Sequence, residues 1–300
     1  MNKDLLQEYK TIRENGIGFY EQKRGLVKVS GKEAVQFLNG LITSDVAKLQ
    51  DNAQMSAAFP NANGRLVAIV RVIRQGDKFL FETEETTHET VFKNLFRFTF
   101  AGDFFVEDLS EKYRFFQISN SKFQIRNSEF IIFQRRSDKD YFVPTDAAES
   151  FKTDLKDSNA NEISDELYEV LRIENGIPKY GVDMDETTIV PEIGLPELIS
   201  YNKGCYIGQE IIARIHFRGH IAKQLTGLIF SEPSAIADLI GQELKSLDGR
   251  NAGRITSAVF SPQLKKIVAL AYVRYDYLAE GTELKIGDLT AKVKDLPFVE

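Results

Sequence analysis

The chain has a single cysteine, which lies in the most distinctive stretch of the sequence, NKGCYIGQE over residues 202–210. The thiol of Cys205 comes two residues after Lys203, and glycines on either side favour a tight entry into a helix predicted over residues 209–215. A nearby ammonium group and a helix N-terminus both lower the pKa of a thiol and favour the thiolate. Cys205 is therefore a candidate functional thiol. The alternative is a small buried apolar residue, as free cysteines often are.

Other potential metal ligands are scarce. One cysteine and three histidines make a poor protein cage for zinc or an iron–sulfur cluster. His216 and His220 are four residues apart, but Gly219 interrupts the helix and no third ligand is evident. We therefore expect no metal site of the protein's own.

Charge is distributed unevenly along the chain. The net charge of −6 argues against a surface that attracts nucleic acid over its whole extent. Between residues 203 and 223, however, four basic residues stand against Glu210 alone, a local net charge of +3: Lys203, Arg214, Arg218 and Lys223. This basic island suits an anionic ligand or an acidic partner protein, and a solvated surface is the alternative.

The elements that must position these residues follow the hydrophobic pattern. Ser30 and Glu33 have the spacing of a capping box, ahead of a helix that carries Ala34 and Leu41 and ends near residues 43–45. A second helix is predicted from Ser164 to a stop signal at residues 175–178. Further helices are predicted over 85–96 and 149–156, and strands over 25–29, 65–74, 79–83, 104–106, 114–119, 123–126, 129–134 and 141–143. The polar stretch 154–165 is expected to be a mobile connection.

After Gly219 the pattern changes to short strands and turns. Strands are predicted over 226–230, 254–259, 267–274, 283–286 and 291–293, which is typical of a small β-barrel. We therefore expect two domains: an α/β (α+β) N-terminal region over 1–220 and a C-terminal β-barrel domain over 221–300.

Several stretches together resemble one family. KGCYIGQEIIAR, residues 203–214, resembles the signature of the YgfZ-type proteins and their mitochondrial counterparts. LRIENGIPKYGVD, residues 171–183, resembles the LRxExGxxxYGxD run shared with the glycine-cleavage T-protein, and IVPE, residues 189–192, resembles the TPxE element of that protein. Weaker matches lie over 29–45 and 296–298. The chain is thus similar to YgfZ-type members of the T-protein superfamily.

This resemblance implies an N-terminal region that binds tetrahydrofolate in a central cavity. It assigns the pterin to Glu192, because a carboxylate can accept paired hydrogen bonds from the amino and ring N–H groups; a solvated loop acid is the alternative. The other residues expected at the folate site are Lys203, Tyr206, Gln209 and Arg214. The basic island would then serve the glutamate tail of folate, while Arg172 and Tyr180 are expected to be structural.

The sequence differs from that of T-proteins at the position of their catalytic aspartates. T-proteins carry a pair of aspartates shortly after a glycine at the start of a strand, and one of these assists chemistry at the folate nitrogen. In the matching strand Ala68 and Ile69 stand where the acids belong, and no acid occurs from Gly64 to Arg74. Losing a positioned acid or base costs about 10²–10⁴ in rate. We therefore do not expect a classical aminomethyltransferase, although other turnover stays open.

The family then implies a function. We expect a tetrahydrofolate-binding accessory protein that supports iron–sulfur cluster assembly or repair, with assembly proteins or client enzymes as partners and with indirect effects on tRNA modification. The alternatives are a folate-dependent aminomethyltransferase or other one-carbon transferase, and direct tRNA binding through the basic island. The acidic net charge makes stable nucleic-acid binding unexpected.

The N-terminus bears on location. MNKDLLQEYK, residues 1–10, has no basic segment followed by an apolar one, so it does not read as a secretory signal. No stretch approaches the roughly 20 apolar residues that a membrane span requires. A cytoplasmic location is expected.

Overall fold

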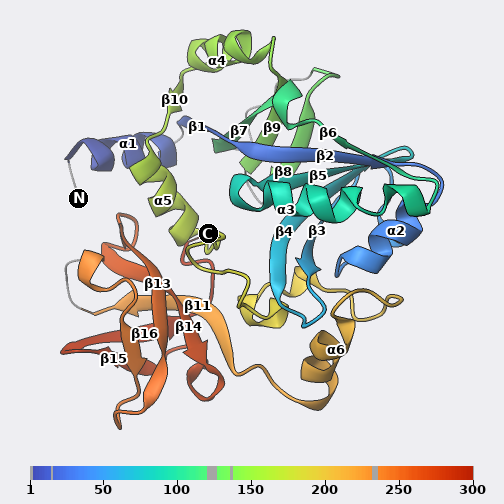
Figure 1. Ribbon diagram of the computed structural model, residues 1–300. Coiled ribbons are helices and arrows are strands. Elements are labelled where there is room, and N and C mark those ends of the chain that lie inside the picture. Colours follow the sequence, from blue (N-terminus) through green and yellow to red (C-terminus); the bar gives the residue numbers. More distant parts are fainter. Residues whose placement is uncertain (1–2, 15, 120–126, 136–137, 232–235, 300) are drawn as a thin grey trace. The chain divides into compact units, whose positions relative to one another are not determined.

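The computed structural model describes residues 3–14, 16–119, 127–135, 138–231 and 236–299 (Figure 1). The chain divides into two compact units. The two-sheet unit comprises Lys10–Ser164 and Glu197–Gln209, and the barrel unit comprises Met1–Tyr9, Asp165–Pro196 and Glu210–Glu300. The stretch 165–196, which the sequence analysis placed in the N-terminal region, therefore belongs to the barrel unit. The domain boundary at residue 220 stays a prediction.

Two five-stranded sheets build the two-sheet unit. The first has the order β3-β4-β5-β2-β6 and consists of Arg24–Ser30 (β2), Gln54–Pro60 (β3), Leu66–Gln75 (β4), Lys78–Glu84 (β5) and Phe105–Asp108 (β6). The second has the order β10-β1-β7-β9-β8 and consists of Ile17–Gln22 (β1), Tyr113–Ser119 (β7), Ile131–Arg135 (β8), Asp138–Pro144 (β9) and Ala160–Glu162 (β10). Only β1 and β10 pair in parallel; the other pairings in these two sheets are antiparallel.

Helices cover the outer faces of these sheets. The helices Ala34–Leu41 (α2) and Glu85–Phe96 (α3) bury Leu38 and Leu95 against the first sheet (Figure 1). The helix Ala148–Asp157 (α4) buries Phe151 against the second. A further apolar cluster, which includes Leu26 and Phe133, packs the two sheets together. The result is a layered α/β arrangement, as expected for an α/β (α+β) region.

The barrel unit is a closed barrel preceded by helical segments. Its strand order is β11-β14-β13-β12-β15-β16, from Lys223–Phe230 (β11), Glu243–Lys245 (β12), Asn251–Ser261 (β13), Lys266–Arg274 (β14), Glu283–Ile286 (β15) and Leu289–Lys294 (β16). Alternate residues of each strand fill its core, among them Leu228 and Val273. The unit also holds Asp165–Glu174 (α5), the short helix Val190–Ile193 and most of Gln209–Arg218 (α6). The expected C-terminal β-barrel is confirmed.

Some local predictions were wrong. The helix α2 starts at Ala34, after the expected capping box, and its N-cap residue Glu33 makes no capping hydrogen bond. The carboxylate of Glu33 instead accepts a hydrogen bond from the backbone of Asp103 at 2.6 Å. The expected mobile connection over 154–165 contains the end of α4 and the paired strand β10. The strand predicted over 123–126 lies outside the described residues.

Candidate functional site

The stretch around Cys205 is fixed to the end of α2 within the two-sheet unit. The ammonium group of Lys203 donates hydrogen bonds to the carbonyl oxygens of Ile42 at 2.7 Å and Ser44 at 2.9 Å. The same nitrogen lies 5.0 Å from the centre of the Tyr206 ring, in a cation–π contact. Lys203 therefore clamps the stretch to the turn that follows α2, so its ammonium is already engaged before any ligand arrives.

Backbone contacts reinforce this clamp on both sides of the cysteine. The amide of Ser200 donates to the carbonyl of Thr43 at 3.0 Å, and the amide of Ile207 donates to the carbonyl of Gly40 at 3.1 Å. The hydroxyls of Thr43 and Ser44 both donate to the carbonyl of Leu198. The stretch 198–207 is thus held at both ends against residues about 155–170 positions earlier in the chain.

Cys205 itself is exposed at the surface of this fixed stretch. The alternative of a buried apolar cysteine is therefore wrong. The helix α6 begins at Gln209, as predicted, and the glycine before it, Gly208, has a φ of +79°. A Cβ atom at Gly208 would overlap the carbonyl oxygen of Asn61, so only glycine fits there. The functional role of the thiol stays a prediction.

Burial perturbs two side chains beside the cysteine. It lowers the pKa of Lys203 to about 8, against the opposing effect of the Asp45 carboxylate. It raises the pKa of Tyr206 to about 12, with a smaller contribution from Tyr201. Tyr206 is therefore a neutral phenol at physiological pH, whereas Lys203 titrates close to it.

We expect the stability that Lys203 contributes to depend on pH. Its pKa is about 8 in the folded chain and near the ordinary value of 10.5 in the unfolded chain. Between these values the unfolded chain holds a proton that the folded chain has released, so this residue makes the free energy of unfolding rise with pH. Lys203→Met lacks this titration. Urea unfolding between about pH 7 and pH 11 should therefore favour the wild type increasingly over the variant. A constant difference would contradict this assignment.

Glu192 lies in the barrel unit, in the short helix Val190–Ile193, with Pro191 in its first turn. Only 6% of the residue is exposed, so the alternative of a solvated loop acid is wrong. The helix ends at Gly194, whose φ is +76°, and a Cβ atom there would lie 3.0 Å from the carbonyl oxygen of Leu225. The short helix therefore packs through Gly194 against Leu225, which is directly opposite Tyr272 in the β11–β14 ladder. This packing holds Glu192 near Tyr272.

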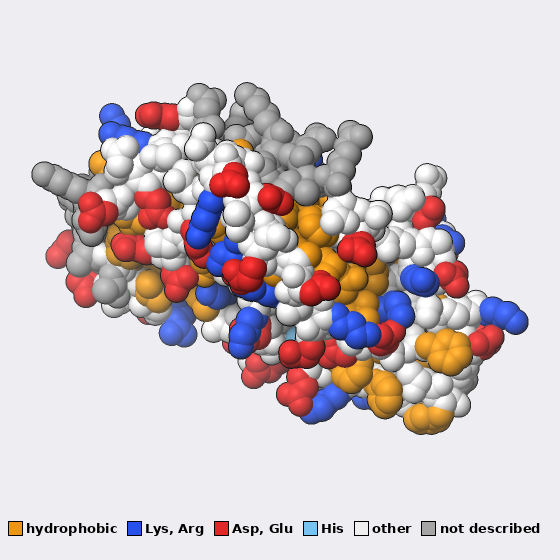
Figure 2. All heavy atoms as spheres, turned by 90° about the horizontal axis from the view of Figure 1, so that it is seen from above, with side chains coloured by type: hydrophobic (Ala, Val, Ile, Leu, Met, Phe, Trp, Pro, Cys, Tyr) orange, Lys and Arg blue, Asp and Glu red, His pale blue; other side chains and the backbone are white. Residues whose placement is uncertain are grey.

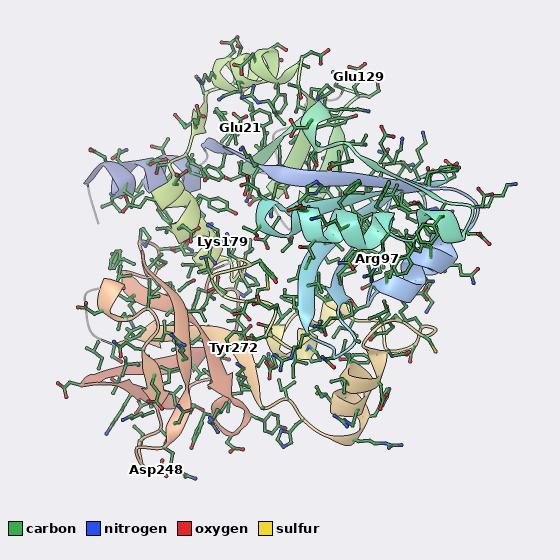
Figure 3. The ribbon with its side chains drawn as sticks, in the orientation of Figure 1. Glu21, Arg97, Glu129, Lys179, Asp248 and Tyr272 are labelled. Atoms are coloured by element: carbon green, nitrogen blue, oxygen red, sulfur yellow. The ribbon has the colours of Figure 1, made fainter. Side chains whose placement is uncertain are left out.

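Tyr272 contributes a feature that the sequence analysis missed. Its hydroxyl is buried, and no group of the described residues forms a hydrogen bond of ordinary geometry with it. Burial raises the pKa of Tyr272, the side chain of Thr188 opposes this, and the carboxylates of Glu192, Asp183 and Asp185 each raise it by a smaller amount. A buried, unsatisfied hydroxyl beside a buried carboxylate is the kind of group that a bound ligand or ordered water satisfies. Tyr272 is labelled in Figure 3.

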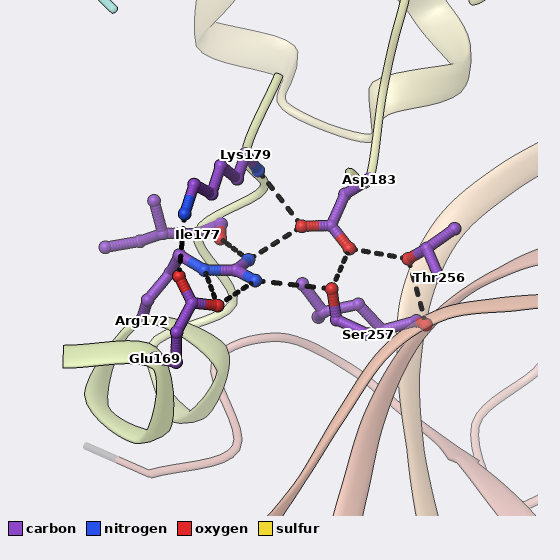
Figure 4. A network of polar contacts seen from close by, with 8 residues as sticks. Glu169, Arg172, Ile177, Lys179, Asp183, Thr256 and Ser257 are labelled. Atoms are coloured by element: carbon purple, nitrogen blue, oxygen red, sulfur yellow. Dashed lines mark hydrogen bonds and ion pairs between the residues drawn. The ribbon is translucent and has the colours of Figure 1, made fainter. Parts of the chain in front are cut away.

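The family run over residues 171–183 forms a buried polar network within the barrel unit (Figure 4). Arg172 donates to the Asp183 carboxylate at 2.7 Å and to the Glu169 carboxylate at 2.7 Å, and the hydroxyls of Thr256 and Ser257 donate to the other oxygen of Asp183. Although burial opposes it, these carboxylates hold the pKa of Arg172 above its ordinary value. The network ties α5 and the loop after it to β13, which agrees with a structural role for Arg172.

The other predicted residues are placed as follows. Gln209 is the first residue of α6, and Arg214 and Arg218 are exposed on that helix. Lys223, the last member of the basic island, lies 4.7 Å from the centre of the Tyr272 ring. Glu192 and Arg214 belong to the barrel unit, whereas Lys203, Tyr206 and Gln209 belong to the two-sheet unit. The grouping of these residues into one folate site stays a prediction.

Ala68 and Ile69 lie in β4, with Ala68 fully buried in the core and Ile69 half-buried. Across the part of the chain that the structure describes, no three His, Cys, Asp or Glu side chains are grouped so as to hold a metal ion. No helix within the described residues is long and apolar enough to cross a membrane.

The chain is similar to proteins of several names. It is 25% identical to the iron-sulfur cluster assembly factor IBA57 homolog, mitochondrial, of Mycosarcoma maydis, over 92% of this chain and 78% of that protein. It is 27% identical to the tRNA-modifying protein YgfZ of Escherichia coli O157:H7, over 78% of each chain. It is 23% identical to an aminomethyltransferase of Thermoanaerobacter pseudethanolicus, over 95% of this chain and 85% of that protein.

The fold and the barrel agree with these relatives. The structure superposes on the glycine cleavage system aminomethyltransferase T of Bartonella henselae with a TM-score of 0.88, at 20% sequence identity, over 99% of this chain and 90% of that one. The glycine cleavage T-protein C-terminal barrel domain matches residues 223–300, which begin with β11. The chain therefore has the fold of this aminomethyltransferase, carries the glycine cleavage T-protein C-terminal barrel domain over residues 223–300, and is similar in sequence to proteins named YgfZ and IBA57.

Proposed function

We propose that this chain is a tetrahydrofolate-binding accessory protein that supports iron–sulfur cluster assembly or repair, and that it affects tRNA modification indirectly. One observation carries the proposal: the thiol of Cys205 is exposed, and Lys203 holds the stretch that bears it against the carbonyl oxygens of Ile42 and Ser44. A fixed, accessible thiol suits brief contact with iron, sulfur or the cluster of a partner protein. The names of the relatives support the same biological setting.

The surroundings of Glu192 fit the polar edge of a pterin. A buried carboxylate can accept two N–H groups, and the unsatisfied hydroxyl of Tyr272 provides a further polar group close by. In this proposal Glu192 orients the pterin, and Tyr206, Gln209 and Arg214 remain predicted folate contacts. Tetrahydrofolate, when bound, supplies a carrier for one-carbon units.

The contacts of Lys203 change its proposed part in that site. Its ammonium is held by two carbonyl oxygens and by the ring of Tyr206, so binding the glutamate tail of folate would require it to leave them. Arg214 and Arg218 are exposed and suit an anionic tail better. Lys203 would then act on the site by holding Tyr206 and Cys205 in place.

Glu192→Gln tests the folate part of the proposal. The substitution keeps the shape of the side chain but removes its charge, and hydrogen bonds to charged groups contribute about 1.5–3 kcal/mol. We expect calorimetry to show tetrahydrofolate binding weakened at least about tenfold. Glu197→Gln, in the two-sheet unit, is the matched control and should bind as the wild type does. Equal affinity of the Glu192 variant and the wild type would remove Glu192 from the site.

A one-carbon transferase is the second candidate, because aminomethyltransferases are among the relatives. The buried Ala68 and the half-buried Ile69 stand against it, since neither side chain can move a proton. A cytoplasmic location is also part of the proposal. The named relatives include mitochondrial and chloroplastic proteins, so they do not by themselves indicate this location.

A further inference from the structure

Three phenylalanine side chains within ten positions of one another in the sequence face solvent in the two-sheet unit. Phe100 is 89% exposed, Phe105 is 67% exposed and Phe96 is 52% exposed. Phe96 ends α3, Phe100 lies in the following short helix Thr99–Ala101, and Phe105 begins β6. We call these three residues the phenylalanine patch. Hydrophobic side chains also stand out among charged ones at the lower right of the face in Figure 2.

The stretch that carries the patch is anchored from beneath. The ring of the buried Phe104 stacks on that of Phe37 with centroids 3.8 Å apart, and Phe98 meets the edge of Phe37 at 6.2 Å. Glu33 and Asp103 exchange two hydrogen bonds, at 2.6 and 3.1 Å. Phe98 and Phe104 therefore pack against the core through Phe37, whereas the three rings of the patch remain exposed to solvent.

The size of the patch limits what covers it. A phenylalanine side chain offers about 150–250 Å² to burial, so the exposed fractions correspond to roughly 400 Å² of apolar surface. A stable interface buries about 800 Å² on each partner. The patch alone is therefore too small for a stable dimer of this chain, and it suits the apolar centre of a transient contact.

The charge at the patch indicates the chemistry of the partner. Arg97 follows Phe96 directly, is exposed, and lies 4.6 Å from the centre of the Phe98 ring. It forms no ion pair with any residue that the structure describes. Exposed aromatic and arginine side chains together are typical of the centre of a protein interface. The net charge of −6 and the nearby acids Glu33 and Asp103 argue against an anionic membrane.

We propose that the phenylalanine patch is the docking surface for a transient protein partner that offers an apolar surface with a carboxylate to meet Arg97. The proposal rests on the proposed function in one respect: the partner is an assembly protein or client enzyme of iron–sulfur chemistry. The α2 helix connects the two surfaces, since Phe37 supports the patch and Gly40 binds the amide of Ile207 beside Cys205. A partner bound at the patch would thus contact a surface that α2 links to the stretch bearing Cys205.

The test uses the full chain in cells that lack it, with the activity of cluster-containing enzymes as the readout. Phe100→Ser combined with Phe105→Ser should leave thermal unfolding and tetrahydrofolate affinity unchanged, because both side chains are exposed. It should lower the restored enzyme activity at least about tenfold, as loss of two interface anchors does. The matched control, Leu247→Ser with Ile240→Ser, removes exposed apolar side chains from the barrel unit and should restore activity fully.

A second measurement is independent of the enzyme readout. A photo-reactive benzoylphenylalanine at position 100 should form a discrete adduct with another protein in cells, and Arg97→Glu should abolish it. The same probe at position 247 should give no such adduct. If the wild type restores no enzyme activity, the proposed iron–sulfur function fails, and the adduct and its dependence on Arg97 alone decide whether the patch is a docking surface.

Three results would overturn the docking proposal. The first is full activity of the Phe100 and Phe105 double variant together with no adduct at position 100. The second is a concentration-dependent dimer in sedimentation that the double variant abolishes, which would make the partner a second copy. The third is binding to phosphatidylserine vesicles that depends on Phe100, which would make the patch a membrane contact.

Discussion

Cys205→Ser is expected to leave the protein folded but unable to restore cluster-dependent enzymes in cells that lack the chain. Because Cys205 is exposed, replacing sulfur with oxygen buries no polar group and should leave the melting temperature and tetrahydrofolate affinity unchanged. A hydroxyl cannot replace a thiolate as a ligand for iron or as an acceptor of sulfur. Enzyme activity in the complemented cells, measured beside protein abundance, checks this expectation.

The control for this experiment lies on the same stretch. Asn202→Ser changes a second exposed side chain there and should restore the enzymes as the wild type does. Iodoacetamide should also label the native wild type about as readily as the urea-unfolded chain, because the thiol is accessible. Slow labelling of the native protein, together with full restoration by Cys205→Ser, would show that the thiol has no part in the function.

Asp183→Ala is expected to cost about 3–5 kcal/mol of folding stability, because it removes one of the two carboxylates that pair with the buried guanidinium of Arg172. The side chain of Asp183 is fully buried and that of Arg172 is 2% exposed. The substitution also removes the acceptor for the hydroxyls of Thr256 and Ser257. Urea unfolding of the purified variant measures the loss.

An exposed pair provides the comparison. Arg250 and Asp248 lie 2.6 Å apart, with both side chains more than half exposed, and solvent screens such pairs. Asp248→Ala should therefore leave the unfolding midpoint unchanged. If Asp183→Ala were as stable as Asp248→Ala, the network over residues 169–183 would not hold the barrel unit together, and the family run would need another explanation.

Strong local patterns explain what the sequence predicted well. The helix α3 was predicted with its observed ends, Glu85 and Phe96, because apolar residues recur at helical spacing after a hairpin. All five barrel strands predicted after Gly219 agree with the structure within three residues at each end, and Glu283–Ile286 agrees completely. These elements are rich in β-branched residues and bounded by turns.

Weak or misleading local signals explain the misses. Gln54–Pro60 has the sequence QMSAAFP, without a β-branched residue, and forms a strand only because β4 pairs with it. Glu243–Lys245 is too short to show alternation. The expected capping box failed because Glu33 bonds to the distant backbone of Asp103, a tertiary contact that no local pattern reveals.

Some features of the candidate site could likewise be predicted from the sequence, and others could not. The exposed thiol and the helix after it could be predicted, because glycines and the family signature mark both. The partners of Lys203 could not be predicted, since they are backbone carbonyls about 160 positions earlier. Tyr272 gave no signal either, because in the sequence it reads as an ordinary strand residue. Its importance depends on Glu192 being brought beside it by the packing of Gly194 on β11.

We propose that this chain binds folate without carrying out glycine cleavage. This proposal is tested most directly by calorimetric titration of the purified wild-type chain with tetrahydrofolate, with a glycine-cleavage assay on the same sample. We expect saturable binding at one site, together with no methylene transfer from an aminomethylated carrier protein above the uncatalysed rate. Absence of binding, or transfer at the rate of a true T-protein, would contradict it.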